Sequence, residues 1–248
     1  MSFLVVEGLQ KSFGGVRAVA GVSFELARGE LLALIGPNGA GKSTCFNMLY
    51  GLLAPDAGAV RLDGRDITAM RPRDIWRLGV GRTFQITATF SSMTVAENVQ
   101  MALISHAGMS FSVIGRARTM TRARALELLD LAGMADQADR AASVLAYGDL
   151  KRLELAIALA HEPGLLLMDE PTAGMAPAER GALMELVGAI VRERHMATLF
   201  TEHDMDIVFG HADRVLVLNR GELIAEGPPD RIRADPRVIE VYLGGGHA

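Results

Sequence analysis

The chain has 248 residues, of which 50% are hydrophobic and 22% charged, a composition typical of a folded protein with room for one α/β unit and an inserted subdomain. Its net charge of -4 argues against a nucleic-acid-binding protein, because such a protein requires a basic face. With one cysteine, Cys45, and no apolar run near the ~20 residues of a membrane span, we expect a cytoplasmic protein with a buried thiol.

The N-terminal region is predicted to be β-structure. Residues 3–6 and 22–26 show the period-2 alternation of strands, and Gly14-Gly15 marks the turn between them. Phe13 precedes this turn, and its ring is either a platform for an adenine ring or an ordinary part of the core. Residues 31–35 are apolar throughout, which is typical of a parallel strand covered on both faces.

A glycine-rich loop follows this strand and precedes a helical segment at residues 44–50. The predicted nucleotide-binding residues here are Gly36, Pro37, Asn38, Gly39, Ala40, Gly41, Lys42, Ser43 and Thr44. The pattern G-x-x-x-x-G-K-S between a strand and a helix indicates a phosphate-binding P-loop, because glycines let backbone N–H groups and a helix N-terminus surround a phosphate. Lys42 would contact the β- and γ-phosphates, and the Ser43 hydroxyl would bind Mg²⁺. We therefore expect the chain to bind a nucleoside triphosphate.

The middle of the chain is predicted to be mainly helical. Short elements come first: a strand at 60–62, a helix at 72–78 and a strand at 79–85 that ends at Gln85. Thr94 and Glu97 form a capping box for a helix that runs to residue 104. Residues 105–119 contain glycines and serines and are predicted to be a loop, whereas residues 121–132 are predicted to be a helix. The expected division is a helical subdomain at 86–145 and a core at 1–85 and 146–248.

The C-terminal part predicts alternating helices and strands. The predicted elements are a helix from near Leu150, a strand at 165–168, a helix from Pro177, a strand at 197–201, a hairpin at 215–225 and a helix at 236–243. Asp169 and Glu170 directly follow the predicted strand at 165–168. Carboxylates at the end of a central strand lie beside the P-loop in an α/β sheet. We expect Asp169 to hold Mg²⁺, directly or through water, and Glu170 to orient and deprotonate the attacking water.

With these motifs the chain resembles the ATP-binding subunit of an ABC transporter over residues 3–243. The resemblance implies a P-loop NTPase core of class α/β with a mostly parallel sheet, an N-terminal antiparallel β subdomain and an inserted helical subdomain. It also implies ATP hydrolysis with Mg²⁺. By the same resemblance Gln85 is a catalytic switch residue and metal ligand, Phe13 stacks on adenine, and His203 is the catalytic histidine that contacts the γ-phosphate.

The signature sequence L-S-G-G-Q of this family corresponds here to Leu145, Ala146, Tyr147, Gly148 and Asp149. In the family this segment binds the ATP held by the P-loop of a partner subunit. The variant L-A-Y-G resembles one of the two ATPases of branched-chain amino acid importers. Two departures stand out: Asp149 places an acid near phosphates, and Ala176 replaces a hydrogen-bonding residue of the loop after Glu170.

The resemblance implies partners as well as chemistry. We expect a head-to-tail dimer, with a second, homologous ATPase as the partner subunit, bound to integral membrane permease subunits that receive solute from a solute-binding protein. The chain would lie on the inner face of the bacterial plasma membrane, without nucleic acid. Two alternatives remain open: an ABC-type ATPase acting off the membrane, and an importer of another small solute such as an aromatic acid or amide. A GTPase is disfavoured because the sequence has no N-K-x-D motif.

Overall fold

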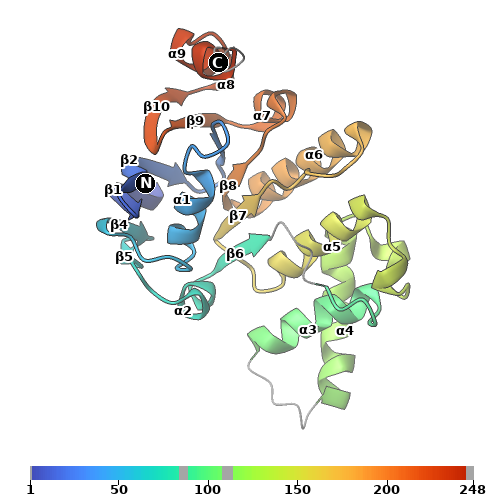
Figure 1. Ribbon diagram of the computed structural model, residues 1–248. Helices are drawn as coiled ribbons and strands as arrows, with labels where there is room; N and C mark the ends of the chain where they lie inside the picture. The colour runs from blue at the N-terminus through green and yellow to red at the C-terminus, as the bar shows by residue number, and fades with distance from the viewer. Residues whose placement is uncertain (1, 84–88, 108–113, 244–248) are drawn as a thin grey trace.

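The computed structural model describes residues 2–83, 89–107 and 114–243, which form two sheets with a group of helices to one side (Figure 1). The first sheet is antiparallel, in the order β2-β1-β4-β5. Its strands are β1 (Ser2–Phe13), β2 (Val16–Ala27), β4 (Ala57–Leu62) and β5 (Arg65–Asp66). Gly14 and Gly15 make the predicted turn between β1 and β2 and have φ angles of 51° and 88°, which glycine adopts readily. The predicted N-terminal antiparallel subdomain is confirmed.

The second sheet has six strands in the order β10-β9-β3-β8-β7-β6. Its strands are β3 (Leu31–Ile35), β6 (Val80–Thr83), β7 (Leu165–Asp169), β8 (Ala197–Thr201), β9 (Arg214–Asn219) and β10 (Glu222–Gly227). All neighbours are parallel except β10 and β9, which form the predicted antiparallel hairpin. The carboxyl ends of β3, β7 and β8 therefore lie on one edge of the sheet, which brings the P-loop, the acid pair and residues 201–203 together.

Strand β3 separates two hydrophobic cores. Leu32 and Leu34 pack with helix α1 (Lys42–Leu49) and with the antiparallel sheet. Leu31, Ala33 and Ile35 point to the opposite face, where they join the core formed with the remaining large helices. Because all five residues are buried, this strand is apolar throughout instead of alternating, as predicted.

The remaining helices lie on the far face of the central sheet or beside it (Figure 1). They are α2 (Pro72–Arg77), α3 (Val95–His106), α4 (Ile114–Leu131), α5 (Tyr147–Leu159), α6 (Pro177–Arg194), α7 (Met205–His211), α8 (Pro229–Arg233) and α9 (Pro236–Leu243). The capping box of α3 is present: Glu97 N donates to Thr94 Oγ1 at 3.2 Å, and Thr94 N donates to Glu97 Oε2 at 2.9 Å. Among the described residues, no helix is long and apolar enough to cross a membrane.

Two predictions about helix boundaries are wrong. Residues 114–119, predicted as loop, form the first turns of α4. The glycine at 115 and the serines before it suggested a loop, but the segment also carries arginine and alanine, which favour helix. Helix α5 begins at Tyr147 and not near Leu150, so the last three residues matched to the signature, Tyr147 to Asp149, lie in its first turn and Ala146 is its N-cap. Helices α7 and α8 and strand β5 were not predicted.

Candidate functional site

The P-loop connects the end of β3 to the start of α1. Gly36 and Gly41 have φ angles of 154° and 107°, and main-chain atoms crowd both positions. A Cβ on Gly36 would lie 2.1 Å from the carbonyl oxygen of Leu218, and a Cβ on Gly41 would lie 2.3 Å from that of Ala18. Side chains are excluded at these two positions, so the loop main chain can lie close to its neighbours.

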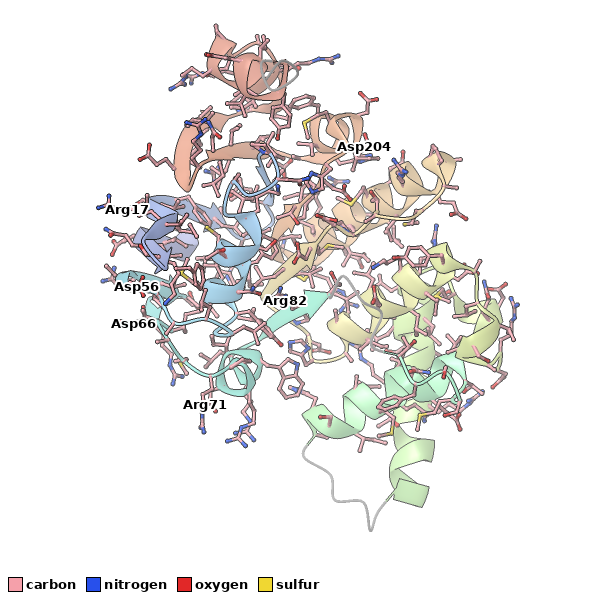
Figure 2. The ribbon with its side chains drawn as sticks, in the orientation of Figure 1. Arg17, Asp56, Asp66, Arg71, Arg82 and Asp204 are labelled. Atoms are coloured by element: carbon pink, nitrogen blue, oxygen red, sulfur yellow. The ribbon has the colours of Figure 1, made fainter. Side chains whose placement is uncertain are left out.

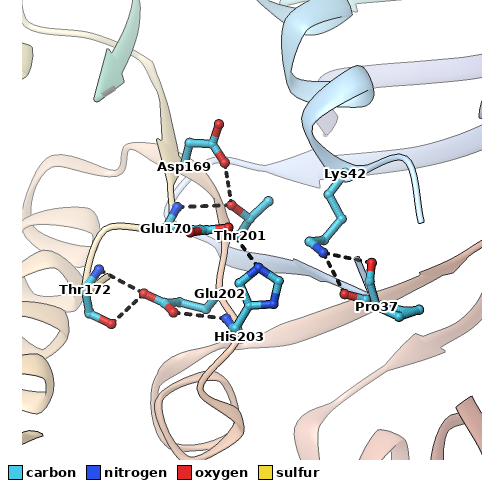
Figure 3. A network of polar contacts seen from close by, with 9 residues as sticks. Pro37, Lys42, Asp169, Glu170, Thr172, Thr201, Glu202 and His203 are labelled. Atoms are coloured by element: carbon cyan, nitrogen blue, oxygen red, sulfur yellow. Dashed lines mark hydrogen bonds and ion pairs between the residues drawn. The ribbon is translucent and has the colours of Figure 1, made fainter. Parts of the chain in front are cut away.

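Lys42, the first residue of α1, is 7% exposed. Its ammonium donates to two carbonyl oxygens of its own loop, Gly36 O at 2.6 Å and Pro37 O at 3.2 Å (Figure 3). Burial lowers the pKa of Lys42, and the charges of Glu170 and Asp169 oppose that shift. A partly buried cation between the loop and two carboxylates is suited to binding an anion such as a phosphate.

Asp169 ends β7, where hydrogen bonds hold its carboxylate. Thr201 Oγ1 donates to Asp169 Oδ1 at 2.8 Å, and Arg82 approaches Oδ2 at 3.5 Å. Arg82 in turn donates to Asn47 Oδ1 of α1 from both terminal nitrogens at 3.1 Å, and it lies between α1 and the end of β6 (Figure 2). Neither Arg82 nor Asn47 was predicted to take part in the site, because an arginine near a strand end carries no general signal.

The side chains at this edge of the central sheet offer oxygen atoms as possible metal ligands. Ser43 is exposed at the start of α1, and Asp169 supplies a carboxylate. Among the described residues, no group of three His, Cys, Asp and Glu side chains is arranged to hold a metal ion by itself. Mg²⁺ prefers one or two protein oxygens together with water and phosphate oxygens, so Ser43 and Asp169 fit this ion.

Glu170 and His203 lie opposite each other, 2.8 Å apart between Oε1 and Nε2 (Figure 3). Glu170 has a φ angle of 50°, a left-handed conformation that is unfavourable for a residue with a side chain. Thr201 holds this conformation, because the N–H of Glu170 donates to the Thr201 carbonyl oxygen at 3.2 Å and to Oγ1 at 3.1 Å. The carboxylate is thereby held at the sheet edge, next to the exposed imidazole.

The buried side chain of Glu202 connects the two loops that carry Glu170 and His203. It is 3% exposed, and Oε1 accepts hydrogen bonds from the N–H and the hydroxyl of Thr172 at 2.9 and 2.6 Å. Its other oxygen accepts from the N–H of His203 at 3.1 Å. Glu202 thus joins the loop after Glu170 to the loop that carries His203. This role of Glu202 was not predicted from the sequence, although the run Thr201-Glu202-His203 follows a predicted strand.

The remaining predicted residues are placed as follows. Phe13 is 50% exposed at the end of β1, so the interpretation as an ordinary core aromatic is wrong, and a flat ring is available to a ligand. Gln85 lies outside the described residues. Cys45 is fully buried in α1, and burial raises its pKa to about 12, so its thiol is structural as predicted.

The residues matched to the signature lie at the start of α5. Tyr147 is 43% exposed, and a Cβ on Gly174 would lie 2.9 Å from its ring atom Cε1, so the ring covers the loop after Glu170. Asp149, in the first turn, accepts a hydrogen bond from Gln137 Nε2 at 3.2 Å. Its negative charge also matches the positive end of the helix. Ala176 caps α6 through its backbone alone.

A P-loop between strand and helix, beside a strand that ends in two acids, defines a P-loop ATPase. The chain belongs to the ABC transporter family, whose model matches residues 19–173. A second model, that of the branched-chain amino acid ATP-binding cassette transporter, matches residues 222–248. The chain is therefore an ATP-binding cassette ATPase.

Curated relatives match over almost the whole chain. The high-affinity branched-chain amino acid transport ATP-binding protein LivG of Salmonella typhimurium is 41% identical over 97% of both chains. The corresponding protein BraF of Pseudomonas aeruginosa is 38% identical over 97% of both chains. Among solved structures, an ATP-binding cassette of an ABC transporter in its ADP conformation superposes with a TM-score of 0.87 at 30% identity, covering 98% of this chain and 99% of that one. The predicted fold class and ATP binding are confirmed.

Proposed function

We propose that this ATPase powers an importer of branched-chain amino acids. The observation that carries the proposal is the match of residues 222–248, because this segment lies outside the ATPase motifs and belongs to a family model named for such transporters. The relatives LivG and BraF, named for the same solutes, support it. Nothing in an ATPase subunit contacts the solute, so the assignment depends on these relatives and not on a binding pocket.

Within the site, we assign roles from geometry. Lys42 and the P-loop amides bind the β- and γ-phosphates, and Glu170 acts as general base on the attacking water. His203 holds the Glu170 carboxylate, and the ring of Phe13 is exposed. On the family resemblance, we propose that His203 contacts the γ-phosphate and that Phe13 stacks on adenine. Gln85 remains proposed as the switch residue and metal ligand on the family resemblance.

Mg²⁺ is proposed as the resident metal, with Ser43 and Asp169 as its protein ligands. When bound, the ion would neutralise charge on the phosphates. The chain's own contribution is to orient the Asp169 carboxylate, through Thr201 and Arg82.

The proposed assembly contains a second, related ATPase and two kinds of further partner. The signature segment, Leu145 to Asp149, of which Ala146 and Tyr147 are exposed, would bind the ATP of the partner ATPase, as the family resemblance implies. A dimer has been solved for a cassette with a TM-score of 0.77 and 26% identity to this chain. The helical subdomain at 86–145 would transmit closure to permease subunits, which receive solute from a binding protein and place this chain at the inner membrane face.

The test is uptake of labelled leucine, isoleucine and valine by cells of the source organism that carry either the parent gene or its Glu170→Gln variant. We expect uptake of all three to fall with the variant, while uptake of an unrelated solute such as proline is unchanged. Unchanged branched-chain uptake together with lost uptake of an aromatic acid or amide would move the assignment to that solute. Failure of the tagged chain to co-purify with membrane subunits would favour an ATPase acting off the membrane.

A further inference from the structure

The proposed general base and its histidine lie on two separate loops that follow neighbouring strands. Glu170 is the first residue after β7, and His203 is the second residue after β8. Their side chains meet at 2.8 Å, at a place where the side chain of His203 is 46% exposed. A contact between partly exposed side chains contributes little to holding two loops together, so other contacts must set their relative position.

The carboxyl group of Glu202 receives hydrogen bonds from both loops (Figure 3). Its Oε1 accepts from the N–H and the hydroxyl of Thr172, at 2.9 and 2.6 Å, and its Oε2 accepts from the N–H of His203 at 3.1 Å. Glu202 is 3% exposed and Thr172 is 1% exposed. The two donors of Thr172 are therefore shielded from water and depend on Glu202 for their hydrogen bonds.

Thr172 belongs to the same tight turn as Glu170. The N–H of Ala173 donates to the carbonyl oxygen of Glu170 at 3.1 Å, which closes this turn. Glu170 has a φ angle of 50°, and a residue with a side chain keeps such a backbone conformation only where its surroundings hold it. Thr201 holds the start of the turn by accepting from the N–H of Glu170, and Glu202 holds Thr172 two residues later.

We propose that Glu202 is a positioning residue for ATP hydrolysis, which acts with Thr172 to hold the Glu170 carboxylate beside His203. The proposal rests on the roles proposed above for Glu170 and His203. Because Glu202 is buried, it acts through the two loops and not on the nucleotide. Its loss therefore lowers kcat, whereas ATP affinity, which depends on the P-loop, is unchanged.

The role requires a carboxyl group and not only a side chain of this shape. Three donors from two loops converge on Glu202, and they occupy both of its oxygens. The amide of a glutamine offers one oxygen and an NH₂ group, so at least one of these donors would face another donor. A glutamine at this position thus releases one of the two loops while it keeps the packing.

The test compares substitutions that keep the shape of the side chain, in the purified full-length chain. We expect Thr172→Val and Glu202→Gln to lower kcat about ten- to hundredfold, because a small displacement of a catalytic group has effects of this size. The Kd for ATP should stay within about twofold of the parent. The matched control is Thr198→Val in strand β8. Thr198 is 0% exposed, and within the described part of the chain its hydroxyl has no hydrogen-bond partner, so kcat should be parental.

Thr172→Ser separates positioning from packing, because it keeps the hydroxyl and removes a buried methyl group. We expect this variant to unfold at lower urea concentration than the parent and to keep kcat within about threefold. If packing alone mattered, Thr172→Ser would lose as much kcat as Thr172→Val, and this result would overturn the proposal. Parental kcat in both Thr172→Val and Glu202→Gln would overturn it as well.

A double variant shows whether the effect passes through Glu170. In the Glu170→Gln background, adding Thr172→Val should lower the residual turnover by less than about twofold, because the group that Thr172 positions is already lost. A further tenfold loss would overturn the proposal. Parental turnover in Glu170→Gln alone would overturn the general base and the positioning role together, whereas slow Glu170→Gln with parental Thr172→Val would overturn only the positioning role. These results are independent of which solute is transported.

Discussion

His203 Nε2 lies 2.8 Å from Glu170 Oε1, so the imidazole holds the carboxylate that we propose as general base. Replacing His203 with alanine removes this contact to the carboxylate, and a misplacement of about 1 Å can lower a rate by about 10²-fold. We expect His203→Ala to reduce kcat on that order. His203→Gln, whose amide can still donate to Glu170, should recover part of the loss in a steady-state ATPase assay. Equal rates for the parent and His203→Ala would remove His203 from the site.

Two glycines of the P-loop have different surroundings, so we expect their replacement by alanine to lower the free energy of unfolding by different amounts. Gly39 and Gly41 both have positive φ angles, of 78° and 107°, but only Gly41 is crowded, by Ala18 O at 2.3 Å from the added Cβ. We expect Gly39→Ala to lower the free energy of unfolding by about 1–2 kcal/mol, from the left-handed backbone alone. Gly41→Ala should lower it by about 3 kcal/mol or more, because the clash adds to that strain. Urea unfolding of both variants measures the difference, and equal values would contradict the close approach.

Because the imidazole of His161 is buried, we expect the free energy of unfolding to depend on pH. Its ring packs against Trp76 and His106, with centroids 5.0 and 6.0 Å away, and burial lowers its pKa to about 4. The unfolded chain takes up this proton below about pH 6.5, whereas the folded protein takes it up only near pH 4. The unfolded state thus binds more protons in that window, so the free energy of unfolding falls as the pH drops, by up to about 3 kcal/mol from this residue.

The check is urea unfolding at pH 7 and pH 4.5 for the parent and for His161→Phe. The phenylalanine ring keeps the aromatic packing and cannot take up a proton. We expect the parent to lose more stability than His161→Phe between the two pH values. The same loss in both proteins would show that His161 is not responsible.

Because of Asp149, we expect the two ATP sites of a heterodimer to hydrolyse ATP at different rates. The signature segment serves the partner's ATP in our assignment, and an acid there repels phosphates. We expect Asp149→Gln to speed hydrolysis at the partner's P-loop several-fold, since removing about 1 kcal/mol of repulsion has an effect of that size. Gln137→Ala is the matched control, because it removes the hydrogen bond to Asp149 and keeps the charge. No response to Asp149→Gln in the assembled transporter would favour two equivalent sites.

The sequence predicted those parts of the site that local patterns define. The P-loop, the acid pair and the capping box of Thr94 and Glu97 each depend on neighbours within a few residues, and the last of these is seen in the structure. Glu202 escaped notice because its partner, Thr172, is distant in the chain and is brought near only by the sheet order. Tertiary contacts of this kind leave no periodic signal.

The fold, too, was predicted correctly where a local pattern defines an element and wrongly where a tertiary contact does. Strand β3 was predicted from its continuous apolar run, which the two cores on its faces explain. The start of α5 was misplaced because residues 145–149 were matched to a signature segment that precedes the helix. In the structure Gly148 belongs to α5 and packs against Glu179, whose Oε2 would lie 3.0 Å from a Cβ there. A glycine needed for close packing looks the same in the sequence as a glycine that ends a helix.

The most direct test of the account is the Glu170→Gln variant, measured for ATP binding and for turnover on the same purified chain. The amide keeps the size of the side chain and a hydrogen-bonding partner for His203, but it cannot accept a proton from water. We predict ATP affinity close to that of the parent and a turnover lower by about 10²–10⁴-fold, the usual contribution of a general base. Parental turnover in Glu170→Gln would contradict the assignment of Glu170 and the mechanism built on it.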